Sequence, residues 1–162
     1  MSQTVLDQVP VLSMAEMSKA EFAQAFGQSF QQFGFAMVRD HGMDPGLIDE
    51  GWAMARRFFN LPEDAKRRYD AKYNGGQRGY TAFGTEIAKG ASENDLKEFW
   101  HVGRDLPEGD PLAQTMPPNV WPDEMPEFKP VFANLYREFD RVGAELLSAI
   151  ALYLGLPERW FD

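Results

Sequence analysis

The fold is decided by one stretch of the chain, Asp95-Leu96-Lys97-Glu98-Phe99-Trp100-His101-Val102-Gly103-Arg104. Aromatic and β-branched residues dominate its middle, and such residues favour strands. We therefore predict a strand over residues 96–102. Successive side chains of a strand point to opposite faces. Glu98 and Trp100 are thus expected on one face, and Phe99 and His101 on the other.

Downstream of this strand, the sequence predicts a long loop followed by a long helix. Prolines recur through residues 105–126 and disfavour regular structure there. From residue 130 to 154, apolar side chains recur every three or four residues, the spacing of one helical face. Gly155 then ends the helix. The apolar positions are Phe128, Val131, Phe132, Leu135, Tyr136, Phe139, Val142, Leu146, Leu147, Ile150 and Leu154.

Upstream, the sequence predicts a strand, a helix and a second strand. Residues 8–12 are β-favourable, and their proline suits an edge strand. Ser18 and Glu21 have the spacing of a helix capping box, and Gly34 supplies a left-handed exit. The apolar run over residues 35–38 is predicted to be a buried strand. The apolar face of the helix consists of Phe22, Phe26, Phe30 and Phe33.

A second helical region opens at Asp44-Pro45, with aspartate as N-cap and proline at the first helical position. A short helix follows over residues 61–69, with acidic residues in its first turn. The polar, glycine-containing stretch over residues 77–91 is predicted to be irregular or loosely extended. The apolar face of the second helix is expected to contain Leu47, Ile48, Trp52, Ala55, Phe58 and Phe59.

The composition predicts a soluble cytoplasmic protein with one domain over residues 1–162. This length suffices to bury a core, and 25 Asp and Glu against 16 Lys and Arg give a net charge of -9. That charge repels nucleic acids and anionic membranes, so neither is an expected partner. The absence of cysteine excludes disulfides and thiol catalysis. No apolar run approaches the ~18–20 residues of a membrane span.

Short motifs follow one another along the chain in an order typical of one protein family. They are Val9-Pro10-Val11-Leu12-Ser13, Asp40-His41-Gly42-Met43, the helix end from Ala55 to Tyr69, Arg78-Gly79-Tyr80-Thr81, the stretch from Asp95 to Gly103, Trp121-Pro122, and the ending from Gly155 to Phe161. In this order they resemble the N-terminal region of the isopenicillin N synthase-like Fe(II)/2-oxoglutarate-dependent dioxygenases. The resemblance extends over nearly the whole chain, and the order of the motifs carries it.

The resemblance implies an α+β fold, a helix-and-strand portion that packs on a double-stranded β-helix barrel expected after Asp162. The family's barrel holds Fe(II) through a His-x-Asp…His set and binds 2-oxoglutarate through Arg-x-Ser, and this chain contains neither motif. Two histidines and a carboxylate suit non-haem iron. We therefore expect Fe(II) and 2-oxoglutarate in the full-length protein and no cofactor bound by this chain alone. The missing barrel half and a small-molecule substrate are the expected partners.

Only two histidines occur, and they leave two interpretations open. His41 and His101 could form a facial triad with one acidic residue, or each could be hydrogen-bonded locally. His41 and Asp44 have His-x-x-Asp spacing, and Asp44 is explained as a helix cap. We favour the second interpretation and predict neither a catalytic residue nor a metal ligand. The acidic residues considered are Asp40, Asp44 and Asp105.

Four residues are candidate substrate contacts. Arg78 could pair with a carboxylate and Tyr80 could hydrogen-bond a polar group; alternatively, Tyr80 anchors a loop and Arg78 is exposed. The resemblance adds Trp100 and Glu98, because in the family this strand face looks into the substrate cavity. The alternative for Trp100 is a place in the core. Glu86 could also contact substrate, but a solvated loop acid is the favoured interpretation.

Two functions follow from the resemblance. The first is the substrate-pocket-contributing half of an oxygenase, inactive alone, whose whole protein hydroxylates, desaturates or ring-closes a small molecule. The alternative is a stand-alone, non-catalytic binding or regulatory module, which should be polar where the long helix would meet a barrel. That helix remains apolar, which favours the first function. The residues concerned are Phe128, Phe132, Phe139 and Leu146.

Overall fold

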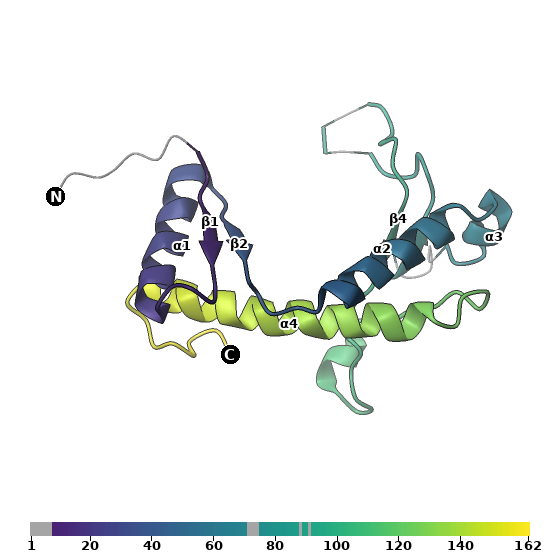
Figure 1. Cartoon of the computed structure of the whole chain (residues 1–162). Helices are drawn as coiled ribbons and strands as arrows, with labels where there is room; N and C mark the ends of the chain where they lie inside the picture. Colours follow the sequence, from purple (N-terminus) through teal and green to yellow (C-terminus); the bar gives the residue numbers. More distant parts are fainter. Residues whose placement is uncertain (1–7, 71–74, 88, 91) are drawn as a thin grey trace. The chain divides into compact units, whose positions relative to one another are not determined.

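The computed structural model describes residues 8–70, 75–87, 89–90 and 92–162. It confirms a mixed fold of helices and small sheets, which divides into two compact units (Figure 1). The first unit consists of residues 1–44 and 138–162, and the second of residues 45–137. Helix α4, Phe128–Tyr153, begins in the second unit and ends in the first.

In the first unit, two short strands form a parallel pair. β1 is Val11–Ser13 and β2 is Met37–Arg39, with Leu12 opposite Val38. Both overlap the predicted segments. The predicted burial of the second strand is wrong, because its residue Met37 is 42% exposed. A two-stranded sheet has two faces to cover, and the described part of the chain leaves this side chain in solvent.

Helix α1, Lys19–Phe33, has the ends that the sequence predicts. Ser18 and Glu21 form the reciprocal capping box, in which each bonds the other's backbone N–H. Gly34 follows with a φ of 78°, in the left-handed region that glycine adopts without strain. Both ends of α1 therefore lie where the local signals in the sequence predict them.

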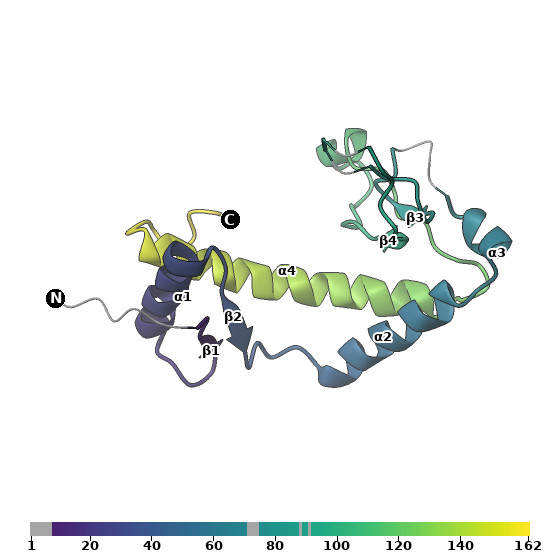
Figure 2. The same ribbon diagram turned by 90° about the horizontal axis from the view of Figure 1, so that it is seen from above.

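The core of the first unit lies where α1 crosses the end of α4, beside the two strands (Figures 1 and 2). Gly27 allows the two helices to approach, since a Cβ there would lie 2.1 Å from the Tyr153 ring. The predicted phenylalanine row is core only in part, because Phe30 is 42% exposed. The buried members of the core are Leu12, Phe22, Ala23, Phe26 and Ala149.

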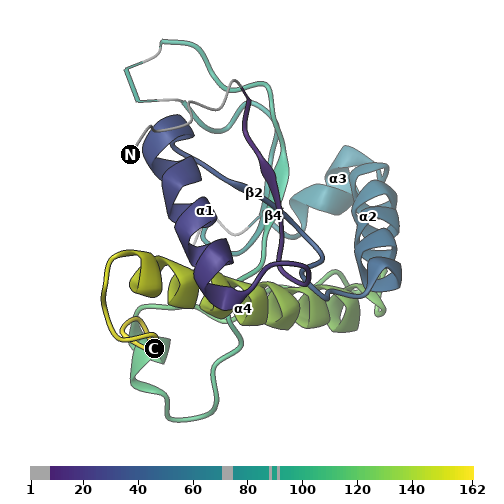
Figure 3. The same ribbon diagram turned by 60° about the vertical axis from the view of Figure 1, so that its left-hand side comes forward.

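In the second unit, helix α2, Pro45–Phe59, runs alongside the first turns of α4 (Figure 2). Gly51 lies so close to α4 that a Cβ there would be 2.4 Å from Leu135 Cδ1. The helix begins at the predicted proline, but the assignment of Trp52 to its apolar face is wrong, because Trp52 is 62% exposed. The short helix α3, Glu63–Arg67, follows α2 directly (Figure 3).

Two further strands form an antiparallel pair in the second unit. They are β3, Gly79–Thr81, and β4, Phe99–His101. The stretch predicted to be irregular or loosely extended contains β3, whose three residues are extended, buried and paired with β4; the prediction did not assign a strand there. Of the strand predicted over residues 96–102, only Phe99–His101 is observed as β4. The proline-rich connection contains one short 3-10 turn, η2, at Pro111–Gln114.

Helix α4 is about 39 Å long, from its 26 residues at roughly 1.5 Å each. Pro130 lies in its first turn, where a missing N–H breaks no helical hydrogen bond. Gly155 follows the helix with a φ of 72°, and the Leu156 N–H donates to the Ala151 carbonyl at 2.9 Å. This is the predicted glycine-based end. Among the helices of the described residues, none is long and apolar enough to cross a membrane.

Candidate functional site

The pairing of β3 with β4 brings three of the four candidate residues together. Tyr80 lies opposite Trp100 in the register. Glu98, two residues before Trp100 and on the same face, accepts a hydrogen bond from the Tyr80 hydroxyl through Oε2. On the other face, the rings of Phe99 and His101 lie 4.6 Å apart between centroids. The side-chain alternation predicted for this stretch is therefore confirmed at its centre.

Lys66 joins these residues from α3 and completes a buried ionic network. Its Nζ donates to Glu98 Oε2 at 2.6 Å and Oε1 at 2.9 Å, and to the Phe59 carbonyl at 3.2 Å. The Lys66 side chain is only 9% exposed and that of Glu98 23% exposed. Burial of either charge alone would be strongly unfavourable, so each makes the burial of the other possible.

The network sets the protonation of both acids. Burial disfavours the charged form of Glu98, but hydrogen bonds from Lys66 and Tyr80 outweigh this and lower the pKa of Glu98. Burial raises the pKa of the Tyr80 hydroxyl, and its hydrogen bond to Glu98 raises that pKa further. At neutral pH the site therefore holds an ionised carboxylate that accepts a hydrogen bond from a neutral phenol.

Trp100 lies in the aromatic core of the second unit. Its ring packs edge-on against Phe58, with centroids 4.6 Å apart, and against Phe128, with centroids 5.2 Å apart. The indole Nε1 is buried and has no hydrogen-bond partner among the described residues. An unpaired buried donor is unfavourable, so this N–H is a group that an acceptor from outside the described chain would satisfy.

Arg78 lies just before β3 and is half-buried rather than exposed. Its guanidinium lies against the backbone of Gly103, where a Cβ would be 2.0 Å from Cζ. Nη1 donates to the Gln77 carbonyl at 2.6 Å, whereas Nε is buried without a partner in the described part of the chain. Asn119 fixes Gly103 through two hydrogen bonds of 2.8 Å. The guanidinium is thus confined with one donor unsatisfied.

The two histidines are each hydrogen-bonded locally, as the favoured interpretation predicts. His41 Nδ1 accepts the Met43 N–H at 3.2 Å. His101 Nδ1 lies 2.8 Å from the Gly76 carbonyl, and because a carbonyl only accepts, this nitrogen carries the proton. Across the described ranges, no three His, Cys, Asp or Glu side chains converge. These residues therefore do not fit Fe(II), whose family site needs two histidines and a carboxylate.

Sequence reasoning did not select Lys66, although a signal was available. Tyr69 follows Lys66 by three residues, so a helical turn places both on one face. Both are buried, at 7% and 8% exposed, whereas Arg67 and Arg68 between them are exposed. An aromatic residue three positions along can therefore indicate a buried lysine. Glu86 is an exposed acid, as expected, paired with Lys97 at 3.0 Å.

Comparison with known families gives one match that covers most of the chain. The model described as "non-haem dioxygenase in morphine synthesis N-terminal" matches residues 9–124. The chain is also 31% identical over 164 residues to the proline hydroxylase buaE of Petromyces alliaceus. It is 29% identical over 147 residues to the 2-oxoglutarate-dependent dioxygenase caaD of Aspergillus niger. These alignments cover 96% and 90% of this chain, but 49% and 45% of those proteins.

Solved structures of oxygenases likewise match nearly all of this chain but only about half of their own length. A protein from Caulobacter crescentus, described as a 2OG-Fe(II) oxygenase family member, superposes with a TM-score of 0.85 and 44% identity. That match covers 94% of this chain and 50% of the other. A full-length Neurospora crassa protein, solved in complex with alpha-KG, superposes with a TM-score of 0.77 and 25% identity, over 95% of this chain and 50% of its own. The chain thus spans about half the length of the relatives it matches.

Proposed function

The chain belongs to the family of non-haem dioxygenase N-terminal domains, and on that premise we propose that it is the substrate-pocket half of an Fe(II)/2-oxoglutarate-dependent oxygenase. The main support for the proposal is that this chain is about half as long as the oxygenases that it matches. Oxygenases that match 90% or more of this chain are about twice as long. The iron ligands that the described residues do not provide would then belong to the other half.

In this enzyme, one half would bind the cofactors and the other half would bind the substrate. A C-terminal barrel holds Fe(II) and 2-oxoglutarate, which when bound supply the oxidising power for hydroxylation, desaturation or ring closure of a small molecule. The present chain binds and orients that molecule and keeps water from it. Without the barrel, the chain is inactive and binds neither iron nor 2-oxoglutarate tightly.

Three side chains of the second unit are the proposed substrate contacts, and Tyr80, which is 1% exposed, positions one of them. Glu98, held by Tyr80 and kept ionised, accepts a hydrogen bond from a substrate N–H or O–H group. Arg78 offers a guanidinium suited to a carboxylate or another acceptor. Trp100 offers an aromatic ring and one N–H. The buried donors of Arg78 and Trp100 support the proposal, since within the described residues they have no partner and a substrate acceptor would satisfy them.

Exposed apolar side chains also support a covering half. Of the four α4 residues expected to meet a barrel, Phe139 is 62% exposed, whereas Phe128 is 1% exposed and lies in the chain's own core. Leu96, just before β4, is 80% exposed. Covering such side chains is favourable by roughly 25 cal/mol per Å² of apolar area. Phe132 and Leu146 are half-buried and also pack on the chain's own cores, so of these four helix residues Phe139 is the one that supports a covering half.

Succinate formation tests the division of work. The 162-residue chain and the natural protein that carries it are each incubated with Fe(II), ascorbate and 2-oxoglutarate. We expect succinate from the natural protein alone. Succinate from the isolated chain would contradict the proposed inactivity. No succinate from either would contradict the oxygenase assignment and favour the stand-alone binding module.

Substitution of Trp100 tests the proposed pocket. Thymine, bound in another complex of the Neurospora crassa protein, and proline, named in the activity of buaE, begin the panel of small molecules screened for stimulated succinate formation. Trp100→Phe keeps an aromatic ring and removes the N–H. We expect a raised KM for a stimulating compound and unchanged succinate formation without it. An unchanged KM would remove Trp100 from the pocket.

A further inference from the structure

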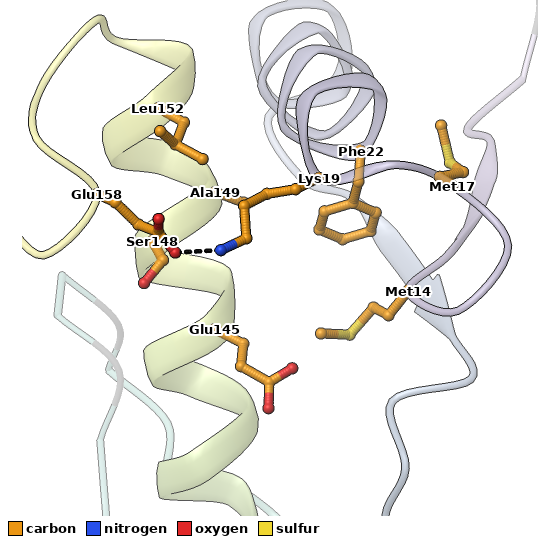
Figure 4. Close-up of a pocket in the computed structure, with 9 residues that line it drawn as sticks. All are labelled: Met14, Met17, Lys19, Phe22, Glu145, Ser148, Ala149, Leu152 and Glu158. Carbon is orange, nitrogen blue, oxygen red and sulfur yellow. Dashed lines mark hydrogen bonds and ion pairs between the residues drawn. The ribbon is translucent and has the colours of Figure 1, made fainter.

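A cavity of about 210 Å³ lies in the first unit, whereas the candidate substrate residues all belong to the second. It opens between the turn after β1, the start of α1, the end of α4 and the C-terminal tail (Figure 4). Water occupies roughly 30 Å³ per molecule in the liquid. The cavity therefore has space for a ligand of about seven to ten heavy atoms.

The floor of this cavity is apolar. Phe22 and Ala149 are 7% and 5% exposed and belong to the core of the unit. Met14, Met17 and Leu152 pack on that core and complete the floor. Methionine side chains adapt to the shape of a ligand, and the face of an aromatic ring attracts a cation. The floor thus suits an apolar body attached to a positive group.

The rim of the cavity is acidic. Lys19 and Glu158 form an ion pair from α1 to the tail, so their charges compensate each other. Figure 4 shows this pair on one side, and the Glu145 carboxylate reaching from α4 toward Met14 on the other. Glu145 pairs with Arg141 at 2.8 Å. Arg141 is outside the lining and also pairs with Glu138, so one cation serves two carboxylates.

We propose that this cavity binds a small organic cation, a primary ammonium group on an apolar body. The ammonium donates to the Glu145 carboxylate, which lines the rim. The apolar body lies on the floor beside Phe22. The site is independent of the proposed oxygenase activity, since it uses neither iron nor any of the four substrate candidates.

Charge determines which ligands this cavity accepts. Because Lys19 compensates Glu158, an anion of the same shape would meet one excess carboxylate, Glu145, in a chain of net charge -9. A neutral alcohol would keep the apolar contacts and lose the charge-assisted hydrogen bond. The order of affinity is therefore amine, then alcohol, then carboxylate.

Three compounds with one ring and one short chain test this order. They are phenethylamine, phenethyl alcohol and phenylacetate, titrated into the 162-residue chain by calorimetry at low salt. We expect the amine to bind about tenfold more tightly than the alcohol, and phenylacetate to bind most weakly. Equal affinities for the amine and the alcohol would overturn the proposal.

Two variants locate the binding. Glu145→Gln keeps the shape of the side chain and removes its charge, so the amine should bind about tenfold more weakly and the alcohol unchanged. Glu16→Gln is the matched control, because Glu16 is an exposed carboxylate of the same unit outside the lining. Ser148→Phe fills the cavity from the rim and should abolish binding of both the amine and the alcohol. Amine binding that survives either lining variant unchanged would overturn the site.

Discussion

The two units bury different kinds of core. In the second unit, aromatic rings surround an ionic network, and Lys66 is the charged residue among the buried positions described. In the first unit the core is apolar, and charge pairs such as Lys19 with Glu158 are 67% and 44% exposed. Exposed pairs contribute little to stability, whereas the loss of one partner from a buried pair is strongly destabilising. Removal of a buried charge should therefore lower the free energy of unfolding most in the second unit. In the first unit, changes of side-chain size in the core should have the larger effect.

The largest expected effect is the loss of the buried cation. Lys66→Met keeps much of the side-chain volume but leaves Glu98 part-buried without its partner. We expect a loss of about 3 kcal/mol in the free energy of unfolding, measured by urea denaturation. Lys19→Met, which removes an exposed cation, should change it by less than ~0.5 kcal/mol. Equal losses in the two variants would show that the contrast between the units is wrong.

A matched pair of glycines tests whether the first unit depends on shape. Gly27→Ala places a methyl group 2.1 Å from the Tyr153 ring, and should cost about 1–3 kcal/mol through overpacking. Gly143→Ala in α4 meets nothing within 4 Å, and should gain up to ~1 kcal/mol from helix propensity. Chemical denaturation of both variants measures the difference. A neutral Gly27→Ala would contradict the close approach of α1 and α4.

The pH dependence of stability should come from the second unit. The pKa of Glu98 is lower in the folded protein than the value of about 4.3 that is usual for glutamate. Ionised Glu98 therefore adds to the free energy of unfolding above about pH 4.3, and this contribution is lost as the pH falls through the folded pKa. The pKa of Tyr80 is higher in the folded protein than the value of about 10 that is usual for tyrosine. Neutral Tyr80 therefore adds to the free energy of unfolding below about pH 10, and this contribution is lost as the pH rises toward the folded pKa.

Tyr80→Phe separates these two contributions. In this variant the alkaline loss due to Tyr80 should disappear, while the free energy of unfolding still falls in acid because Lys66 continues to hold Glu98. Urea midpoints measured from acid to alkaline pH, for the variant and the unmodified chain, give the comparison. Identical profiles for the two proteins would show that the phenol is not coupled to the network.

The smallest expected effect belongs to the cap of α1. Ser18→Ala removes the side chain that accepts the Glu21 N–H, and should cost about 1 kcal/mol. Ser148→Ala, at a half-buried position inside α4, is the control and should change stability by less than ~0.5 kcal/mol. Thermal unfolding measures both. If Ser18→Ala is as mild as the control, packing rather than capping determines where α1 begins.

The elements that sequence predicts well are those whose signals are local. The Ser18 and Glu21 pair, the proline at the start of α2 and Gly155 after α4 each mark an end within a few residues of the chain. The alternation around Trp100 likewise depends only on neighbouring positions. This alternation groups Glu98 with Trp100, whereas Tyr80 joins them only through the pairing of β3 with β4.

What sequence did not predict depends on distant partners. β3 is polar in composition, and its pairing with a segment about twenty residues away is what makes it a strand. Lys66 is buried because Glu98 lies above it, and no local pattern contains both. The exposure of Trp52 follows from which elements cover α2, which periodicity alone does not determine.

Fe(II) binding tests the central claim most directly, namely that this chain is one half of an oxygenase. Pure 162-residue chain and the natural protein that carries it are titrated with Fe(II) under anaerobic conditions, and the bound metal is counted per chain. We expect one tightly bound Fe(II) in the natural protein and no stoichiometric binding by the isolated chain. One Fe(II) bound per isolated chain would contradict the division of the enzyme into two halves.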